Sequence, residues 1–326
     1  MLAYATRRLL LLAPLALGVI FVVFALLQII PGDPARVLLG EDASAEAIAQ
    51  IRSNLGLDRP VVTRFLAYLS DVVRLDLGRS IFRNEPVTQA IASRVGATVE
   101  IAFLAVLLAI TIGITLGVAA AMRRGTLVDA GCMLFAQLGV SMPVFWLGIL
   151  LMYLLAVRLN WFPAIGRGAP LHEALLAALS GQPQLLLTSL SHLAMPAITL
   201  GLHGAAILSR LVRAALLETL AADYVRTARA KGASWRRVVL GHALRNALLP
   251  VISVVGLQFG ALLSGAVLTE GIFGWPGLGQ LAVGAISQRD IPLVQGLVLV
   301  FALMFALVNL TVDLVSALVD PRVRLR

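Results

Sequence analysis

Charged residues are scarce in this sequence, at 13% of 326 residues, whereas hydrophobic residues make up 60%. Soluble domains carry roughly 25% charged residues and about 45–50% apolar ones. A soluble chain of this length could not bury such an apolar excess in one core without leaving large exposed patches. Lipid-facing positions can stay apolar, so the composition excludes a soluble protein and predicts one that crosses a membrane several times.

Cysteine and lysine each occur once, and each rarity excludes one feature. Cys132 has no second cysteine in the chain, so an intramolecular disulfide is impossible. Lys231 is followed by Gly232, and not by the Ser or Thr of the phosphate-binding sequence Gly-x-x-x-x-Gly-Lys-Ser/Thr. The chain therefore lacks an ATP-binding P-loop of its own.

Catalytic constellations are also missing from the sequence. The histidines do not pair at metal-ligand spacing, and His172-Glu173 lacks the second His of His-Glu-x-x-His. A Gly-x-Ser-x-Gly nucleophile elbow does not occur either. We therefore expect neither a metal site nor an enzyme.

Apolar windows predict about six transmembrane helices in an all-α fold. The windows cover residues 9–30, 99–122, 133–157, 190–211, 248–271 and 293–318. The first exceeds a signal-peptide core in length and no small-residue cleavage site follows it, so we expect a retained helix. The stretch 174–187 is broken by Gly181 and Pro183, which predicts an external or re-entrant segment.

Cations cluster in alternate connections between these windows, and short Lys- and Arg-rich loops stay in the cytoplasm. This predicts that both termini and loop 212–247 are cytoplasmic. The expected parts are an N-terminus with the first helix (1–30), an external segment (31–98), a core transmembrane domain (99–318) and a tail (319–326). Because the net charge of +9 resides largely in loops between spans, we expect a lipid bilayer and no nucleic acid as partner.

The external segment contains two predicted helices. Residues 45–55 form a polar-faced pattern, and residues 60–75 form an amphipathic one. The two helices are either a cap on the outer face or a gate or docking surface for an external partner, and their spacing leaves both interpretations open.

The connection between the fourth and fifth windows has the pattern of two short helices. Asp223 is suited to be an N-cap, Gly232 to end the first helix in the left-handed conformation, and Ser234 to cap the second. Such an elbow joins two spans directly, so a partner that grips it could move both. The alternative is an amphipathic connector in the membrane interface.

Polar residues at membrane depth are candidates for function. Ser253, Gln258 and Ser264 lie in the fifth window, and Glu270 ends it near the expected external face, where a gate would lie. These four residues are our candidates for a translocation path. For the small residues of this window, close helix packing is favoured over a place on the path.

Seven segments match one known pattern in the same order. They are Ile30-Pro-Gly-Asp-Pro34, Leu55-Gly-Leu-Asp-Arg-Pro60, Leu75-Asp-Leu-Gly78, Ser141-Met-Pro-Val-Phe-Trp146, Asp223-Tyr-Val-Arg-Thr-Ala-Arg-Ala-Lys-Gly232, His242-Ala-Leu-Arg-Asn-Ala-Leu-Leu-Pro250 and Leu268-Thr-Glu-Gly-Ile-Phe-Gly-Trp-Pro-Gly-Leu-Gly279. The chain resembles the permeases of bacterial ABC importers, in particular the first permease of the dipeptide/oligopeptide/nickel group. Ala228-Arg-Ala-Lys-Gly232 and Leu249-Pro250 resemble their EAA motif, with Ala228 where the name of the motif places Glu.

The resemblance implies a type I permease fold in the bacterial inner membrane, with a periplasmic helical insertion after the first helix. It also implies a second homologous permease, two cytoplasmic ATPases that bind ATP and Mg²⁺, and a periplasmic or extracellular substrate-binding protein. No cofactor would be bound by this chain. Coupling to the ATPases would fall on Asp223, Tyr224, Arg226, Ala228, Arg229, Lys231, Gly232, Leu249 and Pro250.

We therefore expect a permease subunit that forms half of the pathway for di-/oligopeptides or related small substrates. Dipeptide, longer-peptide, nickel-chelate and glutathione transporters share the pattern, so the substrate stays open. A self-contained secondary transporter is the alternative. It predicts transport without an ATPase and, usually, inverted repeats, and no such repeat is evident in the sequence.

Overall fold

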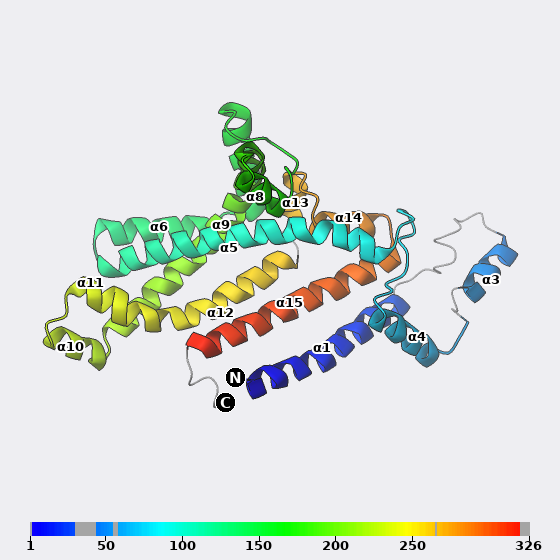
Figure 1. Cartoon of the computed structure of the whole chain (residues 1–326), viewed down its shortest axis with the longest axis horizontal. Helices are drawn as coiled ribbons and strands as arrows, with labels where there is room; N and C mark the ends of the chain where they lie inside the picture. Colours follow the sequence, from blue (N-terminus) through cyan, green and yellow to red (C-terminus); the bar gives the residue numbers. More distant parts are fainter. Residues whose placement is uncertain (1, 30–43, 55–57, 265, 320–326) are drawn as a thin grey trace.

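The computed structural model describes residues 2–29, 44–54, 58–264 and 266–319, and this part of the chain is almost entirely helical (Figure 1). The elements are α1 (Leu2–Ile29), α3 (Ala45–Asn54), α4 (Val61–Val73), α5 (Val87–Met122), α6 (Leu127–Ser141), α7 (Val144–Leu151), the π-helical η1 (Met152–Arg158), α8 (Leu171–Leu179), α9 (Pro183–Leu220), α10 (Asp223–Ala230), α11 (Trp235–Arg237), the π-helical η2 (Val238–Ala243), α12 (Leu244–Leu263), α13 (Val267–Ile272), α14 (Leu278–Ser287) and α15 (Ile291–Val319). An isolated bridge joins Arg79 to Pro86. The expected all-α fold is confirmed.

Among the described residues, four helices are long and apolar enough to cross a membrane: Val87–Met122, Pro183–Leu220, Trp235–Leu263 and Ile291–Ser316. The bent pair Leu127–Ser141 and Val144–Arg158 is a fifth span if its halves are counted together. α1 is 28 residues long, and at about 1.5 Å per residue it exceeds a hydrocarbon core of about 30 Å. Four or five of the six expected spans are thus described directly, and the apolar part of α1 that is described, Ala13–Ala25, is shorter than a span.

The second span begins earlier than its apolar window. α5 starts at Val87, twelve residues before position 99, because the helix continues through the polar residues Gln89, Ser93 and Arg94. Those side chains hid the first turns from a hydropathy window. Residues 87–98, which we assigned to the external segment, are therefore the beginning of α5.

Two expected spans are interrupted. The window 133–157 is split into α6 and α7–η1, which meet at an angle of 103°. Pro143 has no N–H and restricts the residue before it, so Met142 is extended (φ −79°, ψ 127°) and the helix restarts beyond it. The window 248–271 ends as a helix at Leu263, and Glu270 belongs to the separate α13.

The stretch 174–187 is broken where the sequence predicted it. α8 ends before Gly181, which has a φ of +93°, and α9 begins at Pro183 in the first-turn position that proline favours. The part of this stretch from Pro183 onward belongs to α9, which is 38 residues long. The two external helices expected at 45–55 and 60–75 are present as α3 and α4.

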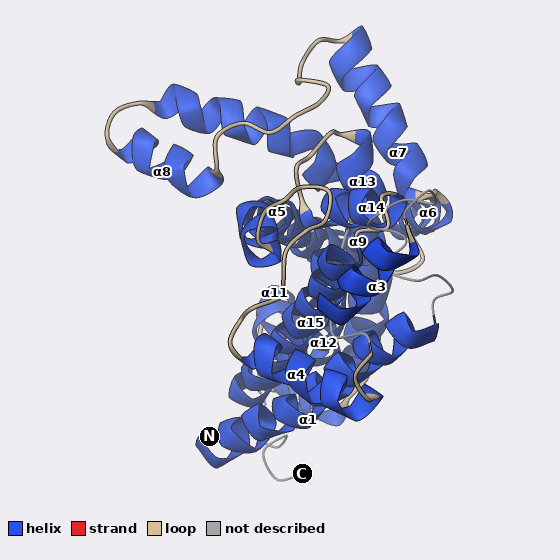
Figure 2. Cartoon of the chain, turned by 90° about the vertical axis from the view of Figure 1, so that its right-hand side faces the viewer, coloured by secondary structure: helices blue, strands red, loops and turns tan. Residues whose placement is uncertain are grey.

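The long helices lie roughly parallel in one bundle, and α7 and α8 project from it (Figures 1 and 2). α10 and α11 lie at one end, and α14 lies at the other with the start of α5 (Figure 1). α1 and α15 pack together and run in opposite directions, so the start of α1 and the end of α15 share the end that carries α10.

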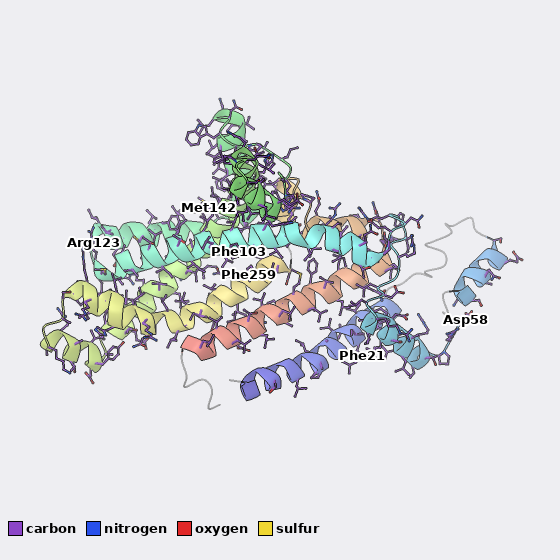
Figure 3. All side chains as sticks on the ribbon, in the orientation of Figure 1. Phe21, Asp58, Phe103, Arg123, Met142 and Phe259 are labelled. Atoms are coloured by element: carbon purple, nitrogen blue, oxygen red, sulfur yellow. The ribbon has the colours of Figure 1, made fainter. Side chains whose placement is uncertain are left out.

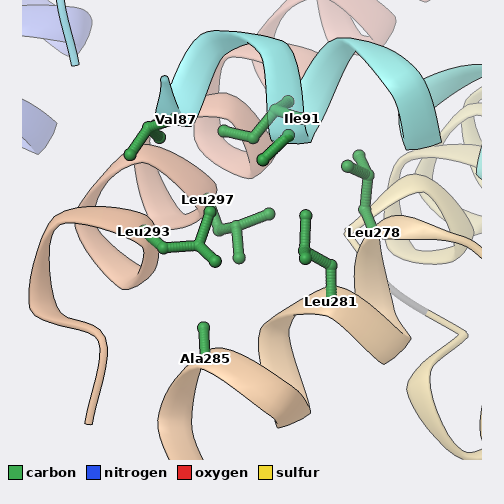
Figure 4. Close-up of a cluster of buried hydrophobic side chains, with 8 residues drawn as sticks. Val87, Ile91, Leu278, Leu281, Ala285, Leu293 and Leu297 are labelled. Carbon is green, nitrogen blue, oxygen red and sulfur yellow. The ribbon is translucent and has the colours of Figure 1, made fainter. Parts of the chain in front are cut away.

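A hydrophobic cluster holds the α14 end of the bundle together (Figure 4). It consists of Val87, Ala90, Ile91, Leu278, Leu281, Ala285, Leu293 and Leu297. These residues come from α5, α14 and α15, so the cluster ties the start of the second span to the start of the last one.

α5 and α9 approach each other closely along a seam of small residues. A Cβ on Gly117 would lie 2.6 Å from the Cβ of Val212 and 2.8 Å from the carbonyl oxygen of Ser209. A Cβ on Gly113 would lie 2.7 Å from the Cβ of Leu208. Because real Cβ atoms do not pack at such distances, glycine is required here for the two helices to be in contact.

Gly117→Leu should push α5 away from α9 and lower the stability of the subunit by about 1–3 kcal/mol, the usual cost of overpacking a filled interior. Thermal unfolding of the purified protein in detergent measures this change. The matched control is Gly131→Leu, because a Cβ at Gly131 meets nothing within 4 Å. Equal melting temperatures for the two variants would contradict the packing role of this seam.

Candidate functional site

The helical elbow predicted between the fourth and fifth spans is present, and its turn is hydrogen-bonded. The N–H of Gly232 donates to the carbonyl of Arg229 (2.9 Å), and the N–H of Ala233 donates to that of Ala228 (3.3 Å). This pair of bonds is a Schellman motif, which needs a left-handed residue at the first position beyond the cap. Gly232 has a φ of +84° and occupies that position.

The start of the elbow differs by one residue from the prediction. Ala222 is the N-cap of α10, and Asp223 is the first helical residue, with its carboxylate 3.6 Å from the Nη1 of Arg226. Ser234 is the N-cap of α11 as expected, with extended backbone dihedrals. The Asp223–Arg226 ion pair is exposed and therefore contributes little to stability. The elbow is instead held by the glycine turn and by the buried face of α10.

The inner face of the elbow is packed into the ends of the membrane helices. Val225 of α10 is buried with Val238 and Val239 of η2, with Leu216 of α9 and with Ala121 of α5. Ala228, the variant position of the motif, packs against the same cluster. A small apolar side chain fits this position because the helix lies against its neighbours here.

The outer face of the elbow is basic and aromatic. Its exposed cations are Arg226, Arg229, Lys231, Arg236 and Arg237. The guanidinium of Arg229 stacks over the ring of Trp235 at 4.8 Å from the centroid, which links α10 to α11 by a cation–π contact. Figure 3 shows side chains radiating from this end of the bundle. The elbow thus presents positive charge on a surface supported by apolar packing.

The elbow is also linked to α12 by a side-chain hydrogen bond. The Nδ2 of Asn246 donates to the hydroxyl of Tyr224 at 2.8 Å. One turn later, Pro250 interrupts the backbone ladder of α12, because proline has no N–H to give to the carbonyl of Asn246. We did not single out Asn246 from the sequence, although it lies in the motif segment before Leu249 and Pro250.

An ion pair that the sequence did not predict braces the same end. Arg213 of α9 donates from Nε (2.6 Å) and Nη2 (2.8 Å) to the two carboxylate oxygens of Asp129 in α6. Asp129 also accepts the N–H of Gly125 (3.0 Å), and the residue is buried. Arg213 was counted as a loop cation, but it lies within α9 and fixes that helix to α6 just before the elbow.

The four translocation candidates do not converge. Ser253 is exposed on α12, whereas the hydroxyl of Ser264 donates back to the carbonyl of Gly260 (2.9 Å). Gln258 turns toward α9, where its Oε1 lies 2.9 Å from the position a Cβ on Gly204 would occupy. Within the described part of the chain, the Nε2 of Gln258 is buried without a hydrogen-bond partner.

Glu270 is fully buried at a junction between α13, α14 and α5. Its carboxylate accepts the hydroxyl of Thr98 (2.8 Å) and the N–H of Gln280 (2.9 Å). Burial raises the pKa of this carboxyl, and the hydrogen bonds oppose that effect. A side chain at Gly277 would overlap the carboxylate, so glycine is required there. Glu270 therefore joins α13 to α5 and α14 and is buried within this subunit.

An apolar groove of about 540 Å³ runs between α5, α12 and α15. Its walls include Phe103, Ile110, Ile252, Phe259 and Val312, and its polar side chains are Arg245 and Thr311. None of the four translocation candidates lines it. Among the described residues, no three His, Cys, Asp or Glu side chains come together as metal ligands.

Comparison with known families agrees with this architecture. Residues 113–325 match the family described as the binding-protein-dependent transport system inner membrane component, and residues 1–102 match the N-terminal family of the same systems. The structure also superposes on a chain of the inward-facing MetNI methionine ABC transporter with a TM-score of 0.52 and 18% sequence identity. The match covers 71% of this chain and 97% of the MetNI chain. That likeness concerns the fold.

Related proteins match over nearly the whole chain. This chain is 42% identical over 332 residues to a dipeptide transport system permease protein DppB of Alkalihalophilus pseudofirmus. The alignment covers 99% of this chain and 100% of that protein. A di/tripeptide permease DppB of Pseudomonas aeruginosa is 44% identical over 99% of both chains. A glutathione transport system permease protein GsiC of Salmonella choleraesuis is 40% identical over 99% of both.

These matches exclude the alternative of a self-contained secondary carrier. A permease of an ABC system works with ATPase and binding-protein partners, and the ATPases bind the ATP. The chain is therefore a multi-pass inner-membrane transport subunit and is not itself an enzyme. The chain belongs to the family of binding-protein-dependent transport system inner membrane components.

Proposed function

We propose that this chain is one of two homologous permease subunits in an ATP-driven importer of di-/oligopeptides or related small peptides. The relatives named above transport dipeptides, di/tripeptides or glutathione, and all of these substrates are peptides. Each of these relatives aligns with 99% of this chain, which supports assigning the same class of substrate to it. Selection among peptides would lie largely in the substrate-binding protein.

The observation that carries the coupling proposal is the two-sided elbow. Its inner face is buried against α5, α9 and η2, and its outer face is exposed and basic. A force applied to the outer face reaches the spans through packed side chains, since interiors are close-packed and transmit displacement. Asp223, Tyr224, Arg226, Arg229 and Lys231 would contact an ATPase.

The remaining motif residues have supporting roles in this proposal. Gly232 permits the turn, Ala228 lets α10 lie close to its neighbours, and Leu249 and Pro250 belong to the part of α12 that receives the motion. Two ATPases would bind two such elbows, one on each permease of the heterodimer.

The proposed topology places the elbow end in the cytoplasm. The start of α1 and the end of α15 lie at that end, so both termini would be cytoplasmic, and the part of segment 31–98 that precedes α5 would be external. The Arg and Lys residues of the elbow favour this orientation. The substrate-binding protein would then dock at the opposite end, near α14.

An exposed stripe on α12 is the proposed surface toward the pathway. Asn246, Pro250, Ser253, Leu257 and Ala261 are all exposed and recur at helical spacing. The stripe starts at the residue that bonds Tyr224 of the elbow, so a displaced elbow would move it. Ser253 remains our candidate on the path. Ser264 and Glu270 are hydrogen-bonded within the fold, and Gln258 faces α9 with its Nε2 unpaired among the described residues.

Gly232→Val tests the coupling geometry. A β-branched side chain in the left-handed region costs about 1–2 kcal/mol, so the turn should open and the outer face should be misplaced. ATP-driven uptake in proteoliposomes should collapse while the subunit still inserts and assembles. Gly241→Val, in the exposed part of η2, is the matched control and should retain uptake. Unchanged uptake in Gly232→Val, or uptake with no ATPase present, would refute the coupling role.

Arg229→Glu tests the outer face. Reversing this charge removes the contact with Trp235 and should weaken association with the ATPase by about tenfold, roughly 1.4 kcal/mol. Co-purification of ATPase with the permease measures the loss. Arg123→Glu reverses an exposed charge outside the elbow at the same end of the bundle and serves as control (Figure 3). An equal loss in both variants would indicate a nonspecific charge effect and contradict the assignment.

A further inference from the structure

A small polar pocket lies at the end of the bundle opposite the elbow. Its volume is about 190 Å³, and its polar side chains are Arg83, Arg94, Gln280 and Gln288. They come from the turn before α5, from α5 and from α14, so three separate segments of the chain form one site.

The pocket has an apolar floor. Leu281, Ala285 and Leu293 line it and also belong to the buried cluster of Figure 4. Pockets that enclose a whole small ligand usually measure about 300–1,000 Å³. This pocket is smaller, so it fits one carboxylate-bearing group and not a complete peptide.

Arg83 is held in place by a rigid turn. Its N–H donates to the Oγ of Ser80 (3.1 Å), and the hydroxyl of Ser80 donates to the buried carboxylate of Asp290 at the start of α15. The side chain of Arg83 pairs through Nε with Glu85, which leaves its two Nη groups for a ligand. The turn thus fixes one cation at the rim.

Arg94 is a cation on which the carboxylates of Glu85 and Glu270 act electrostatically, but from beyond ion-pair distance. The side chain donates from Nη1 to the amide oxygen of Gln280 at 3.4 Å, a long hydrogen bond to a neutral group. Within the described residues, no carboxylate lies within ion-pair distance of Arg94, although the residue is half-buried. Arg94 is only partly buried, so its guanidinium can be reached from the pocket and can bind an anion supplied from outside the chain.

Glycine keeps the pocket open. Gln280, Gly284 and Gln288 are spaced by four residues and share one face of α14. Gly284 lines the pocket, and a Cβ there would meet nothing within 4 Å, so the backbone leaves room for a side chain at this position. This position offers a way to fill the site without removing a charge.

We propose that Arg83 and Arg94, with Gln280 and Gln288, bind a carboxylate that arrives at this end of the subunit. Guanidinium groups match the geometry of carboxylates, and the two amides supply further donors. The proposal rests on the orientation proposed above, which makes this end external. The carboxylate comes either from the peptide substrate or from an acidic side chain of the substrate-binding protein.

Chemical labelling of Arg94 tests the site without ATP or transport. Phenylglyoxal modifies accessible arginines, and mass spectrometry of the assembled transporter reports each one separately. Acetate should slow the labelling of Arg94 several-fold, whereas acetamide, with chloride to match the ionic strength, should not. Arg289, exposed at the same end and outside the pocket, is the internal control and should label equally in both. Equal labelling of Arg94 in acetate and acetamide would overturn the proposal.

Two further arms identify the source of the carboxylate. Protection of Arg94 by Ala-Ala, and not by its C-terminal amide, assigns the carboxylate to the substrate. Protection by the substrate-free binding protein assigns it to that partner. Protection by acetate with neither of these would overturn the proposal, because only an adventitious anion would then bind.

Variants complete the test. In Arg94→Gln, the labelling of Arg83 reports the pocket, and its protection should need about tenfold more ligand, the effect of losing a charge-assisted hydrogen bond. Gly284→Leu should abolish protection by occupying the pocket, and Arg289→Gln should leave it unchanged. Full protection in Gly284→Leu would overturn the proposal. Uptake by the unmodified transporter is measured in the same preparation: if uptake fails while acetate and either Ala-Ala or the binding protein protect Arg94, the proposed function fails and the site stands.

Discussion

The contact between α5 and α9 is the constraint around which the other elements are arranged. Gly113 and Gly117 bring the backbone of α5 against Leu208 and Val212 of α9. At one end of this seam, Ala121 and Leu216 receive the inner face of the elbow. Toward the other end, Thr98 of α5 holds the carboxylate of Glu270. Both ends of the subunit therefore depend on the same pair of helices.

A buried carboxylate organises each of the two connections at the α14 end. Glu270 accepts hydrogen bonds from Thr98 and Gln280, so it joins α13 to α5 and α14. Asp290 receives the hydroxyl of Ser80 and caps α15 through the N–H of Leu293 (3.3 Å). Buried polar groups of this kind are costly when left unpaired, so each carboxylate specifies which segments meet. This is how a turn before α5 and the start of α15 come to share one surface.

The elbow end uses a different physical device. Apolar packing around Val225 fixes the inner face, while the cations outside it stay in water. The Arg213–Asp129 pair, bonded through both carboxylate oxygens, keeps α9 from moving independently of α6. A partner that displaces α10 therefore meets a connected group of helices and not a loose loop. Such coupling through packed elements is how a local event reaches distant surfaces.

Composition and local pattern alone determined a good part of this protein: membrane residence, the all-α fold, the elbow and its turn at Gly232. These features are local, because hydropathy over about 20 residues and one left-handed glycine can be recognised without knowing any neighbour. The motif segments also identified the permease family in advance. The ends of the spans were less certain, since polar first turns such as Gln89 to Arg94 lower the hydropathy of a helix that continues through them.

Only the tertiary structure decided which residues meet. Glu270 and Thr98 are 172 positions apart, Ser80 and Asp290 are 210 apart, and Arg213 and Asp129 are 84 apart. No periodicity in the sequence reports such pairings, because they depend on how helices cross. For the same reason Gln258 turned out to face Gly204, and Arg83 and Arg94 turned out to line one pocket. The sequence specified the helices, and the packing of their small residues brought the polar groups together.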